Sequence, residues 1–257
     1  MGSCFSGKVY AKSDKIKRAE KTMSLNMDNE NLDSLDHLND TPLPYLNVFS
    51  AHNNCLSTVP QEFFEKLTKI KKIDLSKNRY ETIDNVIFQK ESLERLNMSQ
   101  NLLSNIDLRI NNLLLLKEMN LCRNNIIRLD ENIKFSSLEV LELGHNRIKI
   151  IPKSLILSPK LEFIDLSHNE IDSLPEENWE NSNITTINLE GNKIHNLPRN
   201  FLLNSKISVL NLKNNKITRS QIVRDEGYEA FENRRKLKKD QGYLRNLDID
   251  FNFCGLD

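Results

Sequence analysis

The stretch Leu116-Lys117-Glu118-Met119-Asn120-Leu121-Cys122-Arg123-Asn124-Asn125-Ile126 carries the pattern on which the chain is built. Asn124 has apolar residues eight, five and three positions before it, and another two positions after it. The same pattern returns at near-constant spacing around Asn54, Asn78, Asn101, Asn146, Asn169, Asn192 and Asn215. A fixed period of this kind is typical of a stack of like units rather than a single globule.

Each unit is expected to contain one short strand that ends near its asparagine. Met119 and Leu121 flank one intervening residue, and this alternation is typical of a strand. One strand per unit predicts a parallel sheet, which curves because the other side of each unit is bulkier. A buried carboxamide must be hydrogen-bonded, and its two donors and one acceptor can join the backbone of its own turn to that of the neighbouring unit. We therefore expect a structural ladder of Asn54, Asn78, Asn101, Asn124, Asn146, Asn169, Asn192, Asn215 and, after a longer step, Asn252.

The repeated residues resemble the leucine-rich repeat, LxxLxLxxNxL, in eight units from about Leu46 to Ile217. The resemblance implies an α/β fold, a right-handed solenoid with a curved parallel β-sheet on its concave face and short helices or turns on its convex face. An upstream unit with Leu25 and Met27 also fits, but Glu30 stands where the asparagine belongs. That departure suits a capping unit, which has no neighbour on one side.

The pattern predicts three parts of the chain: a basic N-terminal segment over residues 1–22 that could form a helical cap, one solenoid domain over 23–221, and a C-terminal part over 222–257. In the last part, residues 222–240 are expected to form one charged helix, and Leu244 to Cys254 fit a final repeat. An irregular tail is the alternative for that repeat. The helix could touch acidic lipid or RNA, although a solvated cap face explains its charges more simply.

The stretch Glu226 to Arg234 resembles the end of small, N-terminally acylated leucine-rich-repeat proteins of the leucine-rich-repeat-containing protein 57 type. The resemblance implies an interaction role rather than catalysis.

The chain starts Met1-Gly2-Ser3-Cys4-Phe5-Ser6, which matches the N-myristoylation pattern at Gly2 and leaves Cys4 within reach of palmitoylation. A basic run follows, with Lys8, Lys12, Lys15, Lys17 and Arg18. One myristoyl chain alone binds membranes marginally, at about 10⁴ M⁻¹, and basic residues near an anionic leaflet add about 1 kcal/mol each. The sequence therefore predicts a protein held on the cytosolic face of a membrane, most readily the plasma membrane. The simpler alternative is a chance Met-Gly start.

Composition narrows the possible functions. The 36 basic and 36 acidic residues balance, so no global field favours nucleic acid. No hydrophobic run approaches the length of a membrane span, and no apolar stretch of a signal peptide is visible. The four cysteines are scattered, which favours a reducing, cytoplasmic setting. We expect a monomer without a cofactor, a metal or a small-molecule substrate.

The side chains that point outward from the strands are expected to hold a protein partner on the concave face. Val140 and Phe163 should lie side by side there, beside Glu142 and Asp165, and an aromatic group among carboxylates is typical of a binding centre. A single exposed aromatic of no consequence is the alternative. The predicted partner-binding residues are Lys72, Asp74, Arg95, Asn97, Glu118, Asn120, Val140, Glu142, Phe163, Asp165 and Asn188.

Two sets of residues could suggest an enzyme. His145 and His168, with Glu142 and Asp165, could form a metal site, but both histidines stand directly before a ladder asparagine, where the repeat often carries a polar residue. Cys122 lacks an orienting group and an oxyanion donor. The sequence therefore favours a non-enzymatic adaptor. The alternative is a soluble regulatory subunit of an enzyme such as a phosphatase, and a metal- or cysteine-dependent enzyme is the remote option.

Overall fold

The computed structural model describes residues 12–240, and the chain divides into two compact units between Asn125 and Ile126. The sequence placed the repeats of both units in one domain. Both units are built from the same element, a three-residue strand followed by a turn and a short helix or extended segment. The predicted class of fold, an α/β leucine-rich-repeat solenoid with parallel strands, is confirmed.

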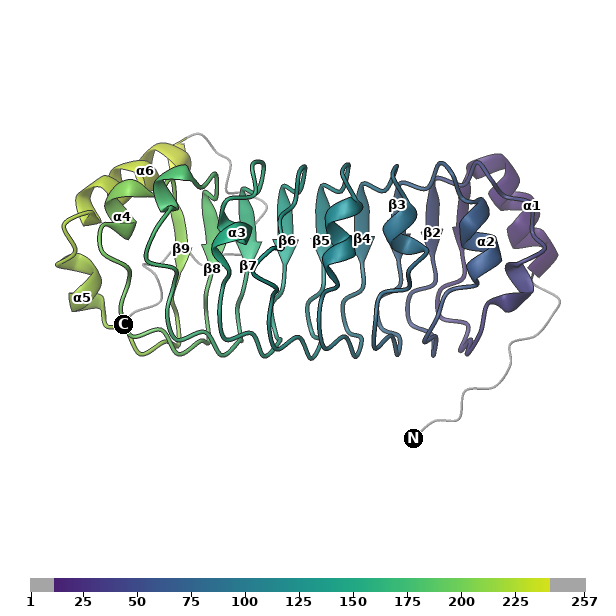
Figure 1. Ribbon diagram of the computed structural model, residues 1–257, viewed down its shortest axis with the longest axis horizontal. Coiled ribbons are helices and arrows are strands. Elements are labelled where there is room, and N and C mark those ends of the chain that lie inside the picture. Colours follow the sequence, from purple (N-terminus) through teal and green to yellow (C-terminus); the bar gives the residue numbers. More distant parts are fainter. Residues whose placement is uncertain (1–11, 241–257) are drawn as a thin grey trace. The chain divides into compact units, whose positions relative to one another are not determined.

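Unit 1 contains five parallel strands that follow one another in chain order (Figure 1). The middle residue of each strand points into the core and is buried, whereas the first and third residues point to the other side. The strands are β1 (Ser24–Asn26), β2 (Val48–Ser50), β3 (Lys72–Asp74), β4 (Arg95–Asn97) and β5 (Glu118–Asn120).

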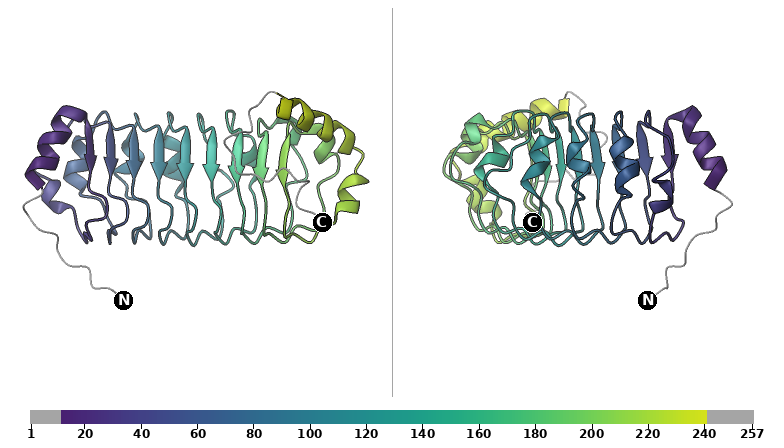
Figure 2. Two further views of the ribbon diagram at one scale, coloured as in Figure 1. Left: turned by 180° about the vertical axis from the view of Figure 1, so that it is seen from behind. Right: turned by 45° about the vertical axis from the view of Figure 1, so that its right-hand side comes forward.

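The helices of unit 1 are short, apart from one at its N-terminal end. Helix α1 (Lys12–Thr22) packs beside β1, with Ala19 buried (Figure 1). The helical turns between the strands cover the other face of the sheet, as the rear view in Figure 2 makes clear. They are η2 (Asp36–Leu38), α2 (Gln61–Lys66), η3 (Ile87–Gln89) and η4 (Leu108–Asn112).

Unit 2 repeats this arrangement with four parallel strands. They are β6 (Val140–Glu142), β7 (Phe163–Asp165), β8 (Thr186–Asn188) and β9 (Val209–Asn211). The helical segments are α3 (Lys153–Ile156), η5 (Trp179–Asn181), α4 (Phe201–Asn204), α5 (Arg219–Val223) and α6 (Tyr228–Asp240).

The single helix predicted over residues 222–240 is wrong, because two helices occupy this region. Helix α5 starts earlier, at a capping box formed by Thr218 and Gln221. A turn that ends at Gly227 separates α5 from α6, and a Cβ atom at this position would collide with the backbone of Leu203. The close approach brings α6 against α4, where Arg234 donates from Nε to the Ile207 carbonyl oxygen at 2.9 Å. The predicted repeat at 244–254 and Asn252 lie outside the described residues.

The asparagines bind each repeat to the one before it. Asn101 Nδ2 donates to the carbonyl oxygens of Leu75 in the preceding repeat (3.0 Å) and of Met98 in its own (3.1 Å). Its Oδ1 accepts the backbone N–H of Tyr80, again in the preceding repeat, at 3.0 Å. The same arrangement recurs at Asn78 in unit 1 and at Asn169 and Asn192 in unit 2.

The ladder also explains the missing asparagine at position 30. Asn54 reaches back to the first repeat, where its Oδ1 accepts the N–H groups of Glu30 (3.1 Å) and Leu32 (3.0 Å). Position 30 itself has no earlier repeat to join. The Glu30 carboxylate instead accepts Lys15 Nζ from α1, so the capping helix occupies the place of a preceding repeat.

A buried lysine caps the C-terminal end of one helix of unit 1. Lys90 Nζ donates to the Phe64 carbonyl oxygen at 2.6 Å, at the C-terminal end of α2. Carbonyl groups at a helix C-terminus lack partners within the helix and favour a cation. Burial nevertheless lowers the pKa of Lys90, because it disfavours the charged amine.

Within residues 12–240, none of the helices is both long enough and apolar enough to cross a bilayer.

We predict that Asn101→Ala lowers the free energy of unfolding by about 1–3 kcal/mol, because the Tyr80 N–H and the Leu75 carbonyl lose a buried partner. Asn196→Ala, at an exposed site outside the ladder, should change it by less than about 0.5 kcal/mol. Urea denaturation of the two variants measures the difference, and equal midpoints would contradict the structural role of the ladder.

Candidate functional site

The first and third residues of the strands form the surface that the sequence assigned to partner binding, which we call the strand face of each unit. The third residues carry polar side chains, and all of them are half-buried from β2 to β9. Asn97 Oδ1 accepts the N–H of Ser99 at 3.1 Å, two residues further on, and Asn120 accepts that of Cys122 at 3.0 Å. Asn and Asp side chains commonly close turns in this way.

The same bond recurs in both units. In unit 1 Asp74 accepts the Ser76 N–H at 2.9 Å. In unit 2 Asp165 and Asn188 accept the N–H groups of Ser167 (2.9 Å) and Glu190 (3.2 Å). These third-position side chains therefore cap the strand ends, and one acceptor oxygen of each is already engaged before any partner arrives.

A Ser, a His and an Asp meet on the strand face of unit 1, but they do not form a catalytic triad. His52 Nδ1 lies 2.8 Å from Ser76 Oγ, and Ser76 Oγ donates to Asp74 Oδ1 at 2.6 Å. Because the hydroxyl proton goes to the carboxylate, the imidazole must donate at Nδ1 and cannot act as the base that a nucleophilic serine requires. Ser76 is also buried. The cluster is a structural network.

The first positions of β3, β4 and β5 in unit 1 are charged and accessible. Lys72 and Arg95 are exposed, and Arg95 Nε lies 2.8 Å from Glu118 Oε2 on the neighbouring strand. Both members of this ion pair are nearly half exposed, so solvent screens it and it adds little to stability. A partner can therefore replace this ion pair with contacts of its own at a small cost in free energy.

The first positions of β6 and β7 in unit 2 are apolar. Val140 and Phe163 are directly paired in the register of β6 and β7, with Glu142 and Asp165 at the third positions. Phe163 is half-buried rather than fully solvent-facing, and so is Val140. The outward positions of β8 and β9, Thr186 and Val209, are each only 5% exposed, contrary to the expectation of a solvent-facing column.

His145 and His168 lie together in unit 2, but not as metal ligands. Their rings stack with centroids 4.3 Å apart and planes tilted by 16°. The lone pairs of an imidazole lie in the ring plane, so two nearly parallel rings cannot both direct one toward a single ion. Within residues 12–240 there is no group of three or more His, Cys, Asp or Glu side chains that could hold a metal ion.

The residue before each ladder asparagine from Asn54 to Asn215 has a positive φ, and the two histidines occupy this turn position. His145 and His168 have φ of 56° and 52°, and Gly191 takes the next place in this row with φ 69°. A Cβ atom at Gly191 would lie 2.6 Å from His168 Nδ1, so the glycine leaves room for the ring. Cys122, the other residue that suggested chemistry, is half-buried in unit 1 and is not part of a disulfide bond.

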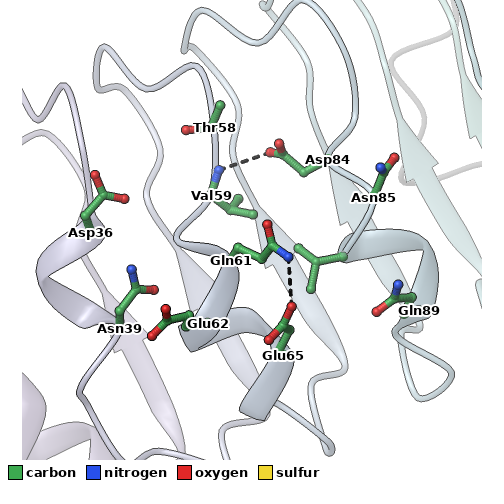
Figure 3. Close-up of a pocket in the computed structure, with 11 residues that line it drawn as sticks. Asp36, Asn39, Thr58, Val59, Gln61, Glu62, Glu65, Asp84, Asn85 and Gln89 are labelled. Atoms are coloured by element: carbon green, nitrogen blue, oxygen red, sulfur yellow. Dashed lines mark hydrogen bonds between the residues drawn. The ribbon is translucent and has the colours of Figure 1, made fainter.

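A polar cavity of about 750 Å³ opens on the helix-bearing side of unit 1 (Figure 3). Its lining includes four carboxylates, from Asp36, Glu62, Glu65 and Asp84. Asp84 Oδ2 accepts the Val59 N–H at 3.0 Å. Burial raises the pKa of Asp84 despite this bond, because the low-dielectric surroundings disfavour the charged form.

The predicted lipidation residues Gly2 and Cys4, and Lys8 of the basic run, lie outside the described residues. Lys12 begins α1. Lys15 is turned toward the protein, where it pairs with Glu30, whereas Lys17 and Arg18 are exposed. The sequence alone grouped these five cations together because the linear run does not reveal which side of the helix faces solvent.

The comparisons with known proteins agree with this architecture. A sequence model of the leucine rich repeat family matches residues 44–103 and 114–171. Osteomodulin of Bos taurus is 34% identical over 86 residues, which are 34% of this chain and 20% of that protein. The volume-regulated anion channel subunit LRRC8E of Xenopus tropicalis is 30% identical over 116 residues, 44% of this chain and 14% of that protein. The chain thus spans a fifth or less of these curated relatives.

Solved structures show the same fold. The chain in the crystal structure of the TLR13–ssRNA13 complex is 26% identical, with a TM-score of 0.68 over 79% of this chain and 30% of that one. An internalin from Listeria monocytogenes is 23% identical, with a TM-score of 0.66 over 80% of this chain and 58% of that one. The fold and its faces define a solenoid built for binding rather than for enclosing a substrate. The chain has the leucine-rich-repeat fold, and nearly half of it matches the sequence model of that family.

We predict that Asp84→Asn raises the free energy of unfolding at pH 7, because it removes a half-buried charge and keeps an acceptor for the Val59 N–H. A raised pKa means that Asp84 contributes stability below its unfolded pKa and loses it as the pH rises through the folded value. The advantage of the variant should therefore vanish below about pH 4. Denaturant midpoints at pH 3.5 and 7 test this, with exposed Glu81→Gln as the control. An advantage of equal size at both pH values would contradict the assignment.

Proposed function

We propose that this protein is a non-catalytic adaptor that holds a protein partner on its strand faces. We further propose that N-myristoylation of Gly2, with palmitoylation of Cys4, anchors it to the cytosolic face of a membrane, the plasma membrane in the first instance. The observation that carries the binding part is the pairing of Val140 with Phe163 in unit 2. An accessible aromatic and aliphatic pair, bordered by the carboxylates of Glu142 and Asp165, can seat an apolar side chain beside a basic one.

The neighbouring positions support this choice of contact residues. Most third strand positions from β3 to β9 cap the backbone, so the accessible first positions are the ones that can change partners without disturbing the fold. In unit 1 these are Lys72, Arg95 and Glu118, which offer charges of both signs. Charged groups at the rim of an interface govern specificity and the rate of association more than affinity.

The anchor is supported by the order of groups in the sequence. A myristoylation pattern, a nearby cysteine and a basic run follow one another within residues 1–18. Two signals are needed for stable attachment, because a single myristoyl chain dissociates readily.

We predict that Phe163→Ala weakens partner capture while the fold persists. Because Phe163 is half-buried, the truncation should cost about 1 kcal/mol of stability, less than the loss of a fully buried aromatic. Ile150→Ala is the matched control, since Ile150 is 72% exposed in the same unit but outside the strand face. Proximity labelling in cells, with denaturation curves of the purified variants, should show neighbours that are lost with Phe163→Ala and kept with Ile150→Ala. Identical neighbour sets for the two variants would rule out the strand face of unit 2 as the binding surface.

We also predict that Gly2→Ala moves the protein from the membrane fraction to the soluble fraction, because the acyl acceptor is lost. Cell fractionation measures this, and the chain with Cys4→Ser separates the contribution of the second acyl group. A wild-type protein found wholly in the soluble fraction would contradict the anchor. It would favour the soluble regulatory subunit as the function.

A further inference from the structure

Helix α1 carries a stripe of exposed polar residues on its outer side. Asp14, Lys17, Arg18 and Lys21 are all exposed, and their spacing of three, four and seven residues places them on one face of a helix. The opposite side packs on the first repeat, with Ala19 buried and Ile16 half-buried. Three of the four stripe residues are cations, and none of the four has an ion pair among the described residues.

The ion pair between Lys15 and Glu30 fixes which side of α1 faces outward. It joins the inner side of the helix to the turn of the first repeat, where the asparagine is replaced. Because α1 is packed against β1, the stripe belongs to a rigid surface rather than to a freely rotating tail. Figure 1 shows α1 lying along the outer end of unit 1, beyond β1.

Two large apolar side chains are exposed at the same end of unit 1. Met23 follows α1 directly and is 47% exposed, and Tyr45 is 69% exposed. The two lie close in the fold, because Asn47, two residues after Tyr45, donates to the Met23 carbonyl oxygen from its backbone at 2.8 Å. Cations beside an exposed tyrosine and a flexible apolar side chain are the combination that binds at the interface of a bilayer.

We propose that this end of unit 1, formed by Lys17, Arg18 and Lys21 of α1 with Met23 and Tyr45, binds the anionic surface of the membrane. The inference rests on the proposed acyl anchor and adds to it a defined orientation. Gly2 and Lys12 are ten residues apart, so an extended chain between them reaches at most about 35 Å. An acyl chain in the leaflet therefore holds α1 close to the lipid headgroups. The membrane then faces the N-terminal end of unit 1, and the strand face of unit 1 stays open to a partner.

The first experiment measures vesicle binding of the protein myristoylated at Gly2. Sedimentation with vesicles of phosphatidylcholine and phosphatidylserine, mixed at a molar ratio of two to one, gives its partition coefficient. The triple variant Lys17→Gln, Arg18→Gln, Lys21→Gln should bind more than tenfold more weakly, since each cation contributes about fivefold. The matched control removes three exposed cations of unit 2 by Lys216→Gln, Arg224→Gln and Lys236→Gln. Equal losses of vesicle binding in both variants would show that the effect depends only on net charge, which would overturn the proposal.

A second experiment separates this proposal from the anchor itself. The Gly2→Ala protein with an N-terminal hexahistidine tag is tethered to vesicles by nickel-chelating lipid. Adding phosphatidylserine should strengthen retention of this protein but not of the same protein with the triple substitution. That result supports the α1 surface even if the cell does not acylate Gly2. No effect of phosphatidylserine on either protein would overturn it, whatever the state of the anchor.

A third measurement tests the depth of contact. Tyr45→Trp places a fluorophore at the proposed surface, and brominated lipids should quench it in the tethered protein. Leu102→Trp, at a 45% exposed position of unit 1 after β4, should stay unquenched. The native Trp179 is only 2% exposed and gives a constant background. Quenching of both variants, or of neither, would contradict the proposed orientation.

Discussion

The carboxamide of the ladder asparagine is the interaction on which each unit depends. A three-residue strand forms few hydrogen bonds of its own, so successive repeats need a further connection. Asn101 supplies it with one side chain that bonds two carbonyl groups and one N–H group across two repeats. An aspartate of the same size has no N–H donors, and a glutamine is longer by one methylene group. The ladder asparagines are buried through most of both units, which makes every one of these bonds costly to lose.

The ladder was visible in the sequence because it follows from spacing alone. The near-constant interval between the asparagines, the apolar positions around Asn124 and the single departure at Glu30 were sufficient to predict the parallel strands and their buried middle residues. The helix break at Gly227 was not predictable, because a helical pattern continues on both sides of it. At this turn Gly227 lies against the backbone of Leu203, which belongs to the preceding helix α4, and a side chain would not fit.

The candidate site was less accessible to sequence reasoning. The alternation of a strand shows that Asn97 and Asp165 point away from the core, but it does not show that each side chain turns back to cap the N–H two residues later. A signal was present, since Asn and Asp dominate this position from β3 to β9, and these residues favour such turns. The exposure of Phe163 and the inward turn of Lys15 depend on neighbours from other repeats. No local pattern carries that information.

Because the third strand positions cap the backbone, the side chains that recognise a partner can vary mainly at the first strand positions. Each repeat from β3 to β5 and from β6 to β7 offers one accessible side chain on its strand face, at the first strand position, about 4.8 Å from the next in the direction across the strands. Within a unit these side chains form one row across the strands. A partner that binds along this row contacts one variable residue per repeat, beside the polar residues of the third strand positions. Change in specificity can then proceed one repeat at a time, by substitution at a position that holds nothing else together.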